Sequence, residues 1–405
     1  MKNKRISCLL AICIMATTLG LTGCGEKETK QDTELDEKTV NETETENTSV
    51  EESETEEENE TVQIIMVGDM LMHDRVYESG EQDDGTYNFD YLFTNVTDFV
   101  QSVDLALVNQ ETIIGGTELG LSGYPCFNSP YELADAELKA GFDVLLQATN
   151  HAMDKGKTGI LNDINYLRDS VPELTYLGIH DTKESYDSVY ICEVNGIKIA
   201  ILNYTYGTNG IPLPEDMPYA VSMLEEEKVL ADIQYAEEMA DFTIVCPHWG
   251  TEYVLETDYM QAQWTQLFLE NGVDLVIGAH PHVIEPVEWV EDEEGHKMLV
   301  YYSLGNFVNG TSSEGHGVTT RMVGGMADVT IGRLEDGSVA IIDDDIHPLI
   351  CHIDENESYT TYFIEDYNEA LASENLILRQ DDSFSLEQCQ DIVDTVWGDY
   401  FEQKK

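Results

Sequence analysis

The chain has 405 residues, of which 80 are acidic and 20 are lysine or arginine, so its formal net charge at pH 7 is −60. Such an excess of negative charge excludes nucleic acid binding as a main activity, because neutralising phosphates requires a basic surface. It also opposes the binding of any other polyanion unless a metal ion or a local basic group supplies the attraction.

Residues 1–23 are predicted to be a lipoprotein signal peptide. The basic residues Lys2, Lys4 and Arg5 precede an apolar stretch that ends in small residues. Its last residues, Leu-Thr-Gly before Cys24, resemble the lipobox of bacterial lipoproteins, in which the cysteine becomes the lipid-bearing N-terminus; an uncleaved anchor is the alternative. In both cases we expect the rest of the chain to be held at the extracytoplasmic face of the cell membrane.

Residues 24–61 are predicted to form a disordered acidic tether. From residue 25 onward this segment holds sixteen Asp or Glu and three Lys, with almost no apolar side chains, so it cannot bury enough surface to fold. Removing these residues and the three basic residues of the signal peptide leaves 64 acidic and 14 basic side chains in 62–405, a balance of about −50. A body of this length can hold one large domain, which we place at residues 62–345.

Apolar runs of strand length recur through this domain, and each is followed by polar residues. Runs bounded in this way are typical of strands buried on both faces. They begin at residue 62 and recur at 104–108, 143–147, 241–246 and 274–277. Helical patterns lie between them at 130–140, 156–168 and 223–239. Strands that alternate with helices predict an α/β fold.

Further strands are predicted at 196–204, 297–302, 324–331 and 338–342. The last two flank Asp336-Gly337, which favours an antiparallel hairpin and hence a second sheet. Residues 346–405 are predicted to be a C-terminal extension, with a helix at 385–401 that packs or oligomerises. The five cysteines beyond residue 62 are scattered, which disfavours a thiolate zinc site and leaves a single disulfide open.

Metal-binding side chain types gather at the ends of five predicted strands. Taken singly, each has a plain reading as a hydrogen-bonding histidine, a Gly-Asp turn or an Asn helix cap. Ligands gather at the carboxyl ends of strands in α/β sheets, however, and oxygen and imidazole donors without thiolate suit zinc, manganese or iron. The residues are Asp69 with His73, Glu111, Asn150 with His151, His248, and His280 with His282.

Their order resembles that of the calcineurin-like metallophosphoesterases and, more specifically, that of the CapA family of poly-γ-glutamate capsule biosynthesis proteins. The matching segments are GDMLMHD at 68–74, VNQET at 108–112, the stretch 127–156, PHWGTEY at 247–253, GAHPHV at 278–283 and SLGNF at 303–307. The resemblance covers about 62–342 and implies a four-layer α/β/β/α sandwich of the metallophosphoesterase type.

The resemblance also implies a dinuclear centre of two divalent ions, Mn, Zn or Fe, and assigns roles to individual residues. His151 would be an acid that is not a ligand, and Glu111 would stand where phosphoesterases place a bridging aspartate. His73 follows Asp69 at a longer spacing than the family's Asp-x-His, so it is a ligand, a neighbour of the ligands or neither. The implied ligands are Asp69, Glu111, Asn150, His248, His280 and His282.

Four further residues have two readings each. Asp154 lies three residues after His151 and either orients it or faces solvent. Asn306 supports the site or occupies a turn. Trp249 and Tyr253 line a substrate cleft or pack in the core.

The expected function is a metal-dependent hydrolase or transferase that acts in the synthesis, export or anchoring of poly-γ-glutamate or a similar anionic polymer. Its partners would be that polymer or its precursor, the membrane through the lipid, and a polymer synthase or export protein, and not nucleic acid. The first alternative is a secreted phosphoesterase. The second is a scaffold without catalytic activity in a surface-polymer complex.

Overall fold

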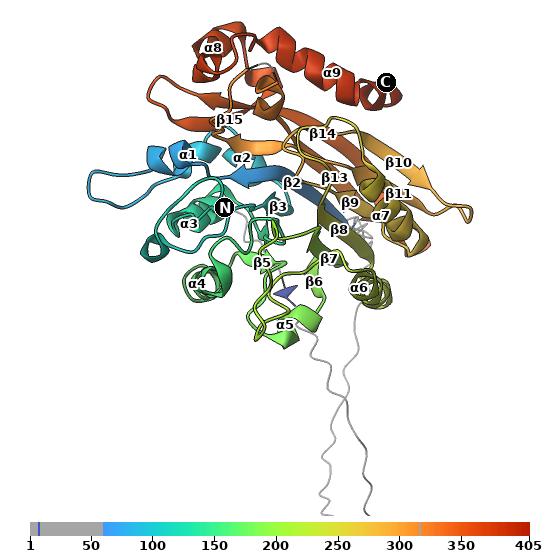
Figure 1. Ribbon diagram of the computed structural model, residues 1–405. Coiled ribbons are helices and arrows are strands. Elements are labelled where there is room, and N and C mark those ends of the chain that lie inside the picture. The colour runs from blue at the N-terminus through green and yellow to red at the C-terminus, as the bar shows by residue number, and fades with distance from the viewer. Residues whose placement is uncertain (1–6, 9–59, 316) are drawn as a thin grey trace, which may run out of the picture. The chain divides into compact units, whose positions relative to one another are not determined.

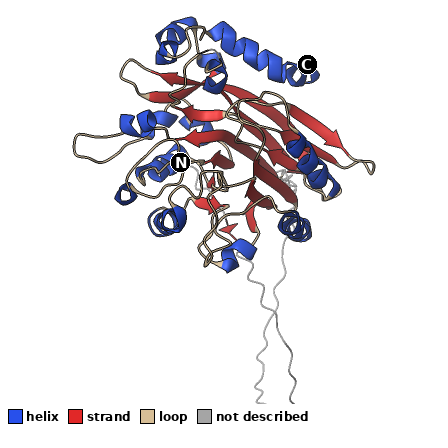
Figure 2. Ribbon diagram, in the orientation of Figure 1, coloured by secondary structure: helices blue, strands red, loops and turns tan. Residues whose placement is uncertain are grey.

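The computed structural model describes residues 7–8, 60–315 and 317–405. Two β-sheets face each other and helices lie on their outer sides (Figures 1 and 2). Of the predicted signal peptide only Ser7–Cys8 are described, and the lipidation site Cys24 and the tether up to residue 59 lie outside the described residues. Within the described residues, no helix is long and apolar enough to cross a bilayer.

The first sheet has the order β1-β6-β7-β8-β9-β11-β10. Strands β7, β8, β9 and β11 run parallel. The flanking strands are antiparallel to their neighbours, β6 to β7, β1 to β6 and β10 to β11. The bounds are β1 Ser7–Cys8, β6 Tyr190–Val194, β7 Ile197–Thr205, β8 Phe242–His248, β9 Leu275–Ile277, β10 Val287–Glu291 and β11 Lys297–Tyr301.

The second sheet has the order β15-β14-β13-β2-β3-β4-β5, and β12 also pairs with β2. Strands β2 to β5 run parallel, whereas β13, β14 and β15 are antiparallel. The bounds are β2 Thr61–Leu71, β3 Leu105–Asn109, β4 Val144–Leu146, β5 Thr175–Leu177, β12 Asn306–Asn309, β13 Val323–Arg333, β14 Val339–Ile353 and β15 Tyr359–Phe363.

Helices connect the parallel strands. Their bounds are α1 Asp74–Ser79, α2 Thr97–Val100, α3 Glu132–Ala140, α4 Gly156–Ser170, α5 Lys183–Asp187, α6 Glu226–Met239, α7 Tyr259–Glu270, α8 Glu369–Glu374 and α9 Leu386–Gln403. Short 3-10 helices lie at Asp90–Phe93, Thr117–Leu119, Thr319–Met322, Ile364–Asp366 and Leu376–Arg379.

Alternating side chains of the first sheet fill two different cores. In β7, Ile199 and Ile201 point into the large core that also holds β2 and β3 of the other sheet, whereas Leu202 and Tyr204 belong to a second core. That second core includes Phe268 of α7. Because successive side chains of a strand point to opposite faces of the sheet, one continuous apolar run can pack against both the facing sheet and the covering helices. The four-layer arrangement expected from the family resemblance is confirmed.

The predicted strands and the hairpin across Asp336-Gly337 are confirmed, since β13 and β14 pair antiparallel on either side of this turn. The boundary predicted between residues 345 and 346 differs from the structure, because it falls inside β14. The segment after it supplies β15 and two helices to the same compact unit. The predicted boundary fell inside β14 because Asp343 to Asp345 interrupt the apolar pattern of the strand, although its pairing with β13 continues through them.

The helix predicted at 385–401 is α9, and it packs onto the sheets through Trp397. This side chain is fully buried, and its indole Nε1 donates to the carbonyl of Glu285 at 2.8 Å. Gly325 makes room for the ring, because a Cβ there would lie 2.6 Å from it. The C-terminal segment is therefore a structural part of the domain. All five cysteines beyond residue 62 are free thiols.

We expect Trp397→Ala to lower the free energy of unfolding by about 3–5 kcal/mol, because it removes a large buried ring and leaves the Glu285 carbonyl without its donor. Urea denaturation would measure the change. Trp289→Ala is the control, since Trp289 is 43% exposed. An equal, small effect of both substitutions would show that α9 does not contribute to the stability of the domain.

Candidate metal centre

Both sheets contribute side chains to one site at their carboxyl edges. In the second sheet, Asp69 lies near the end of β2, and Glu111 and Asn150 follow β3 and β4. In the first sheet, His248 is the last residue of β8 and His280 follows β9. Parallel strands end at the same edge of their sheet, which explains why residues far apart in the sequence meet here.

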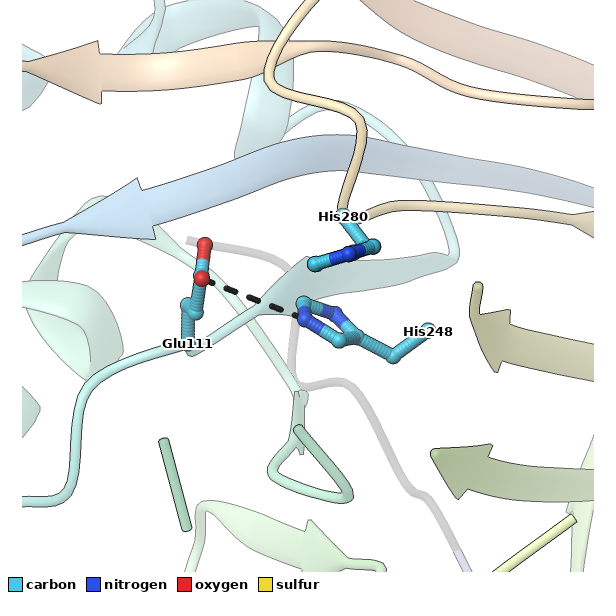
Figure 3. A group of neighbouring side chains, drawn as sticks. All are labelled: Glu111, His248 and His280. Carbon is cyan, nitrogen blue, oxygen red and sulfur yellow. Dashed lines mark ion pairs between the residues drawn. The ribbon is translucent and has the colours of Figure 1, made fainter. Parts of the chain in front are cut away.

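The Glu111 carboxylate lies among three imidazoles. Its Oε1 is 3.7 Å from Nε2 of His282, 3.9 Å from Nε2 of His248 and 4.0 Å from Nε2 of His151. Figure 3 shows Glu111 pointing toward His248, with His280 beside both. Both carboxylate oxygens of Glu111 and the Nδ1 of His280 are buried, and all three atoms lack a hydrogen-bond partner.

Buried polar atoms without partners cost free energy, so this arrangement calls for a binding partner. A carboxylate surrounded by imidazole nitrogens is a donor set that divalent cations prefer. Within the described residues, three groups could hold an ion: Glu111 with His248 and His280, Asp69 with Glu111 and His282, and Glu252 with His280 and His282. The residues present therefore fit a metal site.

Electrostatics agree with this fit. Burial raises the pKa of Glu111 well above its usual value, and burial lowers the pKa of His248 and of His280 well below theirs. The two histidines are thus neutral, as metal ligands must be. Burial also lowers the pKa of His282, but the neighbouring Glu111 and Asp69 outweigh it and raise that pKa to about 9. A divalent cation would compete with this proton.

Asp69 and two asparagines hold the ligand side chains in place. Oδ1 of Asp69 accepts from Nδ2 of Asn109 at 2.8 Å and from the backbone N–H of His280 at 3.2 Å. Its Oδ2 lies 3.0 Å from Nδ1 of His282, which also lies 3.1 Å from Oδ1 of Asn306. These contacts engage Nδ1 of His282 and direct its Nε2 toward Glu111.

Asn150 and His248 face each other across the two sheets. Oδ1 of Asn150 lies 3.0 Å from Nε2 of His248, and Nδ2 of Asn109 lies 3.4 Å from Nδ1 of the same histidine. Asn150 thus places an amide oxygen next to a ring nitrogen of His248, a candidate ligand, as a shared ion would require.

The loop that carries His280 and His282 has an unusual backbone. Both residues have positive φ, 103° and 59°, a region that costs roughly 1–3 kcal/mol for side chains other than glycine. The loop is held because Tyr253 N–H donates to the Pro281 carbonyl at 2.8 Å and Trp249 N–H to the Ala279 carbonyl at 3.0 Å. The loop is therefore a strained element held by its surroundings and not an ordinary turn.

Two glycines of the sequence motifs allow backbones to approach the site closely. A Cβ on Gly68 would lie 1.9 Å from the Gly305 carbonyl oxygen, which accepts from the Asp69 N–H at 2.9 Å. A Cβ on Gly278 would lie 2.2 Å from the Tyr302 carbonyl oxygen. Any side chain at either position would push strand ends apart.

His151 and Asp154 form a hydrogen-bonded pair at the edge of the site. Nδ1 of His151 lies 2.7 Å from Oδ2 of Asp154, and the same oxygen accepts from the Phe127 N–H at 2.6 Å. Asp154 is almost fully buried, so the alternative that it faces solvent does not apply. The pair leaves Nε2 of His151 directed toward Glu111, at 4.0 Å.

The structure places the other predicted residues, His73, Trp249 and Tyr253, outside the candidate metal-binding groups. His73 caps α1 and lines the cavity beside the site, and none of the three groups within the described residues includes it. Burial, followed by the charge of His282, lowers the pKa of His73 to about 4. Trp249 is buried and donates from Nε1 to the Tyr302 carbonyl, so it packs in the core, whereas Tyr253 lines the cavity.

A cavity of about 860 Å³ opens beside the ligand cluster. Its lining includes His73, His151, Tyr253, His282 and Asn306. The lining also contains residues that the sequence did not single out, namely Asn209, Glu252 and Arg321. Glu252 lies within PHWGTEY and could have been found there, but Arg321 does not come directly after a predicted strand and no motif signals it.

Comparison with known proteins places the chain among capsule proteins. It is 27% identical over 266 residues to "Capsule biosynthesis protein CapA" of Bacillus anthracis, a match that covers 62% of this chain and 60% of that one. It is 31% identical over 168 residues to "PGA biosynthesis protein CapA" of Bacillus subtilis, which covers 41% and 42%. The matches thus span less than two thirds of these relatives.

Among solved structures, a 5'-nucleotidase precursor from Thermus thermophilus shares 12% identity at a TM-score of 0.44, over 84% of this chain and 59% of that one. The family model described as "Bacterial capsule synthesis protein PGA_cap" matches residues 63–311, more than half of the chain. The chain therefore belongs to this family of capsule synthesis proteins.

Proposed function

We propose that this protein is a metal-dependent hydrolase or transferase that acts in the synthesis, export or anchoring of poly-γ-glutamate or a similar anionic capsule polymer. Membership of the PGA_cap family and the names of the two relatives support the biological setting. The observation that carries the chemistry is the buried Glu111 carboxylate, which has no hydrogen-bond partner and lies within 4.0 Å of three imidazoles.

The ligands would be Asp69, Glu111, Asn150, His248, His280 and His282. Glu111 belongs to both of the fully buried candidate groups. The proposed ions are Mn, Zn or Fe. Two bound divalent ions would supply a hydroxide nucleophile at neutral pH and positive charge for an anionic oxygen. Asn109 and Asn306 would keep Asp69 and His282 in the orientation that binding needs.

His151 would act as the general acid. The Asp154 carboxylate, 2.7 Å from Nδ1, would hold the imidazole in place. A proton on Nε2 would then pass to the leaving group of a substrate bound in the adjacent cavity. Asp154 is a positioning residue in this scheme, because it acts through His151.

The proposal includes the cellular setting predicted from the sequence. The protein would be anchored by lipid at Cys24 on the extracytoplasmic face of the membrane, where it would meet the polymer or its precursor and a synthase or export protein. The support is the order of the first 24 residues, which ends in Leu-Thr-Gly-Cys. Incorporation of labelled palmitate into the wild type and not into Cys24→Ala would test it.

Elemental analysis of the purified full chain tests the metal centre. We expect about two divalent ions per chain, and a loss of bound metal in Asp69→Ala and His280→Ala while both variants stay folded. His347→Ala is the matched control, since His347 pairs with Asp328 on the β13–β14 hairpin, outside the three candidate metal-binding groups. A wild type that stays without metal in metal-replete buffer would refute the centre and favour the scaffold alternative.

Turnover by the same samples separates the remaining functions. Cleavage or transfer of γ-linked glutamate oligomers that depends on Asp69 would support the proposed polymer reaction. Turnover of phosphodiesters without any reaction of the oligomers would favour the phosphoesterase alternative.

A further inference from the structure

Arg321 introduces a positive charge into the cavity beside the ligand cluster. It follows β12 in the chain, within the short helix Thr319–Met322. Among the described residues that line the cavity it is the only lysine or arginine. The side chain is half-buried, so its charge is partly removed from water.

This guanidinium has no carboxylate partner in the described part of the chain. Arg333 pairs with Glu60 and Asp241, and Arg379 with Glu357 at 2.9 Å, whereas Arg75, which forms no ion pair with a described residue, is exposed to solvent. Nε of Arg321 is buried without a hydrogen bond, and Nη1 makes one long hydrogen bond, 3.4 Å to Oγ1 of Thr311. In a protein of net charge −60, carboxylates are abundant, so an arginine without one in a cavity is not explained by the stability of the fold. It is explained if the arginine binds a ligand.

Two contacts fix Arg321 relative to the metal-site residues. Its guanidinium carbon lies 4.0 Å from the centre of the Tyr253 ring, and that ring lies 5.9 Å from the His282 ring. Its carbonyl accepts from Nδ2 of Asn306 at 3.0 Å, and Oδ1 of the same asparagine lies 3.1 Å from Nδ1 of His282. The ring covers one face of the guanidinium, which leaves the N–H donors in its plane available to an acceptor.

We propose that Arg321, backed by Tyr253, binds a carboxylate of the acidic polymer substrate and so places the adjacent linkage at the metal centre. This inference rests on the proposed function. One guanidinium matches the single charge of a carboxylate, whereas a phosphate dianion would leave excess negative charge beside Glu252 and Asp154 in the same cavity. The subsite would also attract a polyanion locally, which the net negative charge of the whole chain otherwise repels.

Binding of a γ-linked glutamate tetramer to the full chain tests the subsite, measured by calorimetry in metal-replete buffer. We expect Arg321→Gln to weaken binding about ten- to a hundredfold, as loss of a charged hydrogen-bonding partner does, and to leave the metal content unchanged. Arg321→Lys should bind with intermediate affinity, because it keeps the charge and loses the planar fork. A tetramer whose free α-carboxylates are amidated should bind the wild type and Arg321→Gln equally.

Arg379→Gln is the control for net charge, because Arg379 is exposed and does not line the cavity. An equal loss of affinity in Arg379→Gln and Arg321→Gln would overturn the subsite, and so would failure of the wild type to bind the tetramer. Inorganic phosphate is the competing probe. If it displaced the tetramer at lower concentration than acetate and its own binding required Arg321, the assignment to a carboxylate would fall.

Failure of the proposed reaction would be recognised separately. Binding that depends on Arg321 in a protein without turnover would support the subsite and contradict the enzyme. Turnover that depends on Asp69 but is the same in Arg321→Gln, in kcat and in KM, would support the enzyme and contradict the subsite.

Discussion

Replacing His151 by glutamine is expected to lower kcat about a hundred- to ten-thousandfold while the chain keeps its metal. General acid catalysis contributes rate factors of this size, and glutamine cannot carry the proton that Nε2 of an imidazolium donates. The side chain lies at the edge of the cluster and its Nδ1 is engaged by Asp154, so its loss should not disturb the ligands. Turnover of the γ-glutamyl oligomer and elemental analysis on the same samples would measure both effects.

Asp154→Asn provides the companion variant, because Asp154 acts through His151. We expect a smaller loss alone and no added loss in the double variant, since residues that act as a unit are not additive. His347→Gln is the matched histidine control and should keep full activity. Loss of metal in His151→Gln would make His151 a ligand, and unchanged turnover would remove it from the mechanism.

Glu111→Gln is expected to abolish metal binding and yet to stabilise the protein measured in chelator. The buried carboxylate has no hydrogen-bond partner, and the rise of its pKa through burial reflects the free energy lost by removing it from water. Because the folded pKa is raised, this loss grows as pH rises above the ordinary carboxyl range. A neutral amide avoids it, so urea denaturation at pH 7 should show a gain of roughly 1–3 kcal/mol.

Glu137→Gln is the control that separates the gain in stability from the loss of metal binding. Glu137 is fully buried, its oxygens also lack hydrogen-bond partners, and burial raises its pKa, but it lies on α3 and belongs to none of the candidate metal-binding groups. It should gain stability without losing metal. If Glu111→Gln bound metal like the wild type, the central role of Glu111 would be refuted.

The sequence predicts the strand ends of the site well, for a physical reason. Buried parallel strands give continuous apolar runs, and the polar residues that follow within a few positions of each run fall at the common edge of the sheet. Asp69, Glu111, Asn150, His248 and His280 are found in this way, and the structure brings them together. Their binding of metal stays a prediction.

Residues whose position depends on loop packing could not be found in this way. Arg321 reaches the cavity because Asn306 and Tyr253 hold it there, and neither contact is signalled by spacing along the chain. The edge strand β15 and the polar middle of β14 were missed because their apolar residues do not follow their buried positions. In β15 burial alternates, but the polar Thr361 is buried and Tyr362 is half-buried, and the middle of β14 carries three exposed or half-buried aspartates. His73 matches a metal-binding residue type, but α1 turns it toward the cavity rim.

The division of the ligand set between two sheets has a consequence for the living cell. Both of the fully buried groups join residues of the two sheets, so their ions would bind only to the assembled sandwich. Bound ions would favour the folded state in proportion to the logarithm of their free concentration. Metal starvation would then lower the amount of intact protein through degradation of opened chains, as well as its activity. The supply of a trace element would in this way set the amount of intact protein that is available for the proposed polymer reaction.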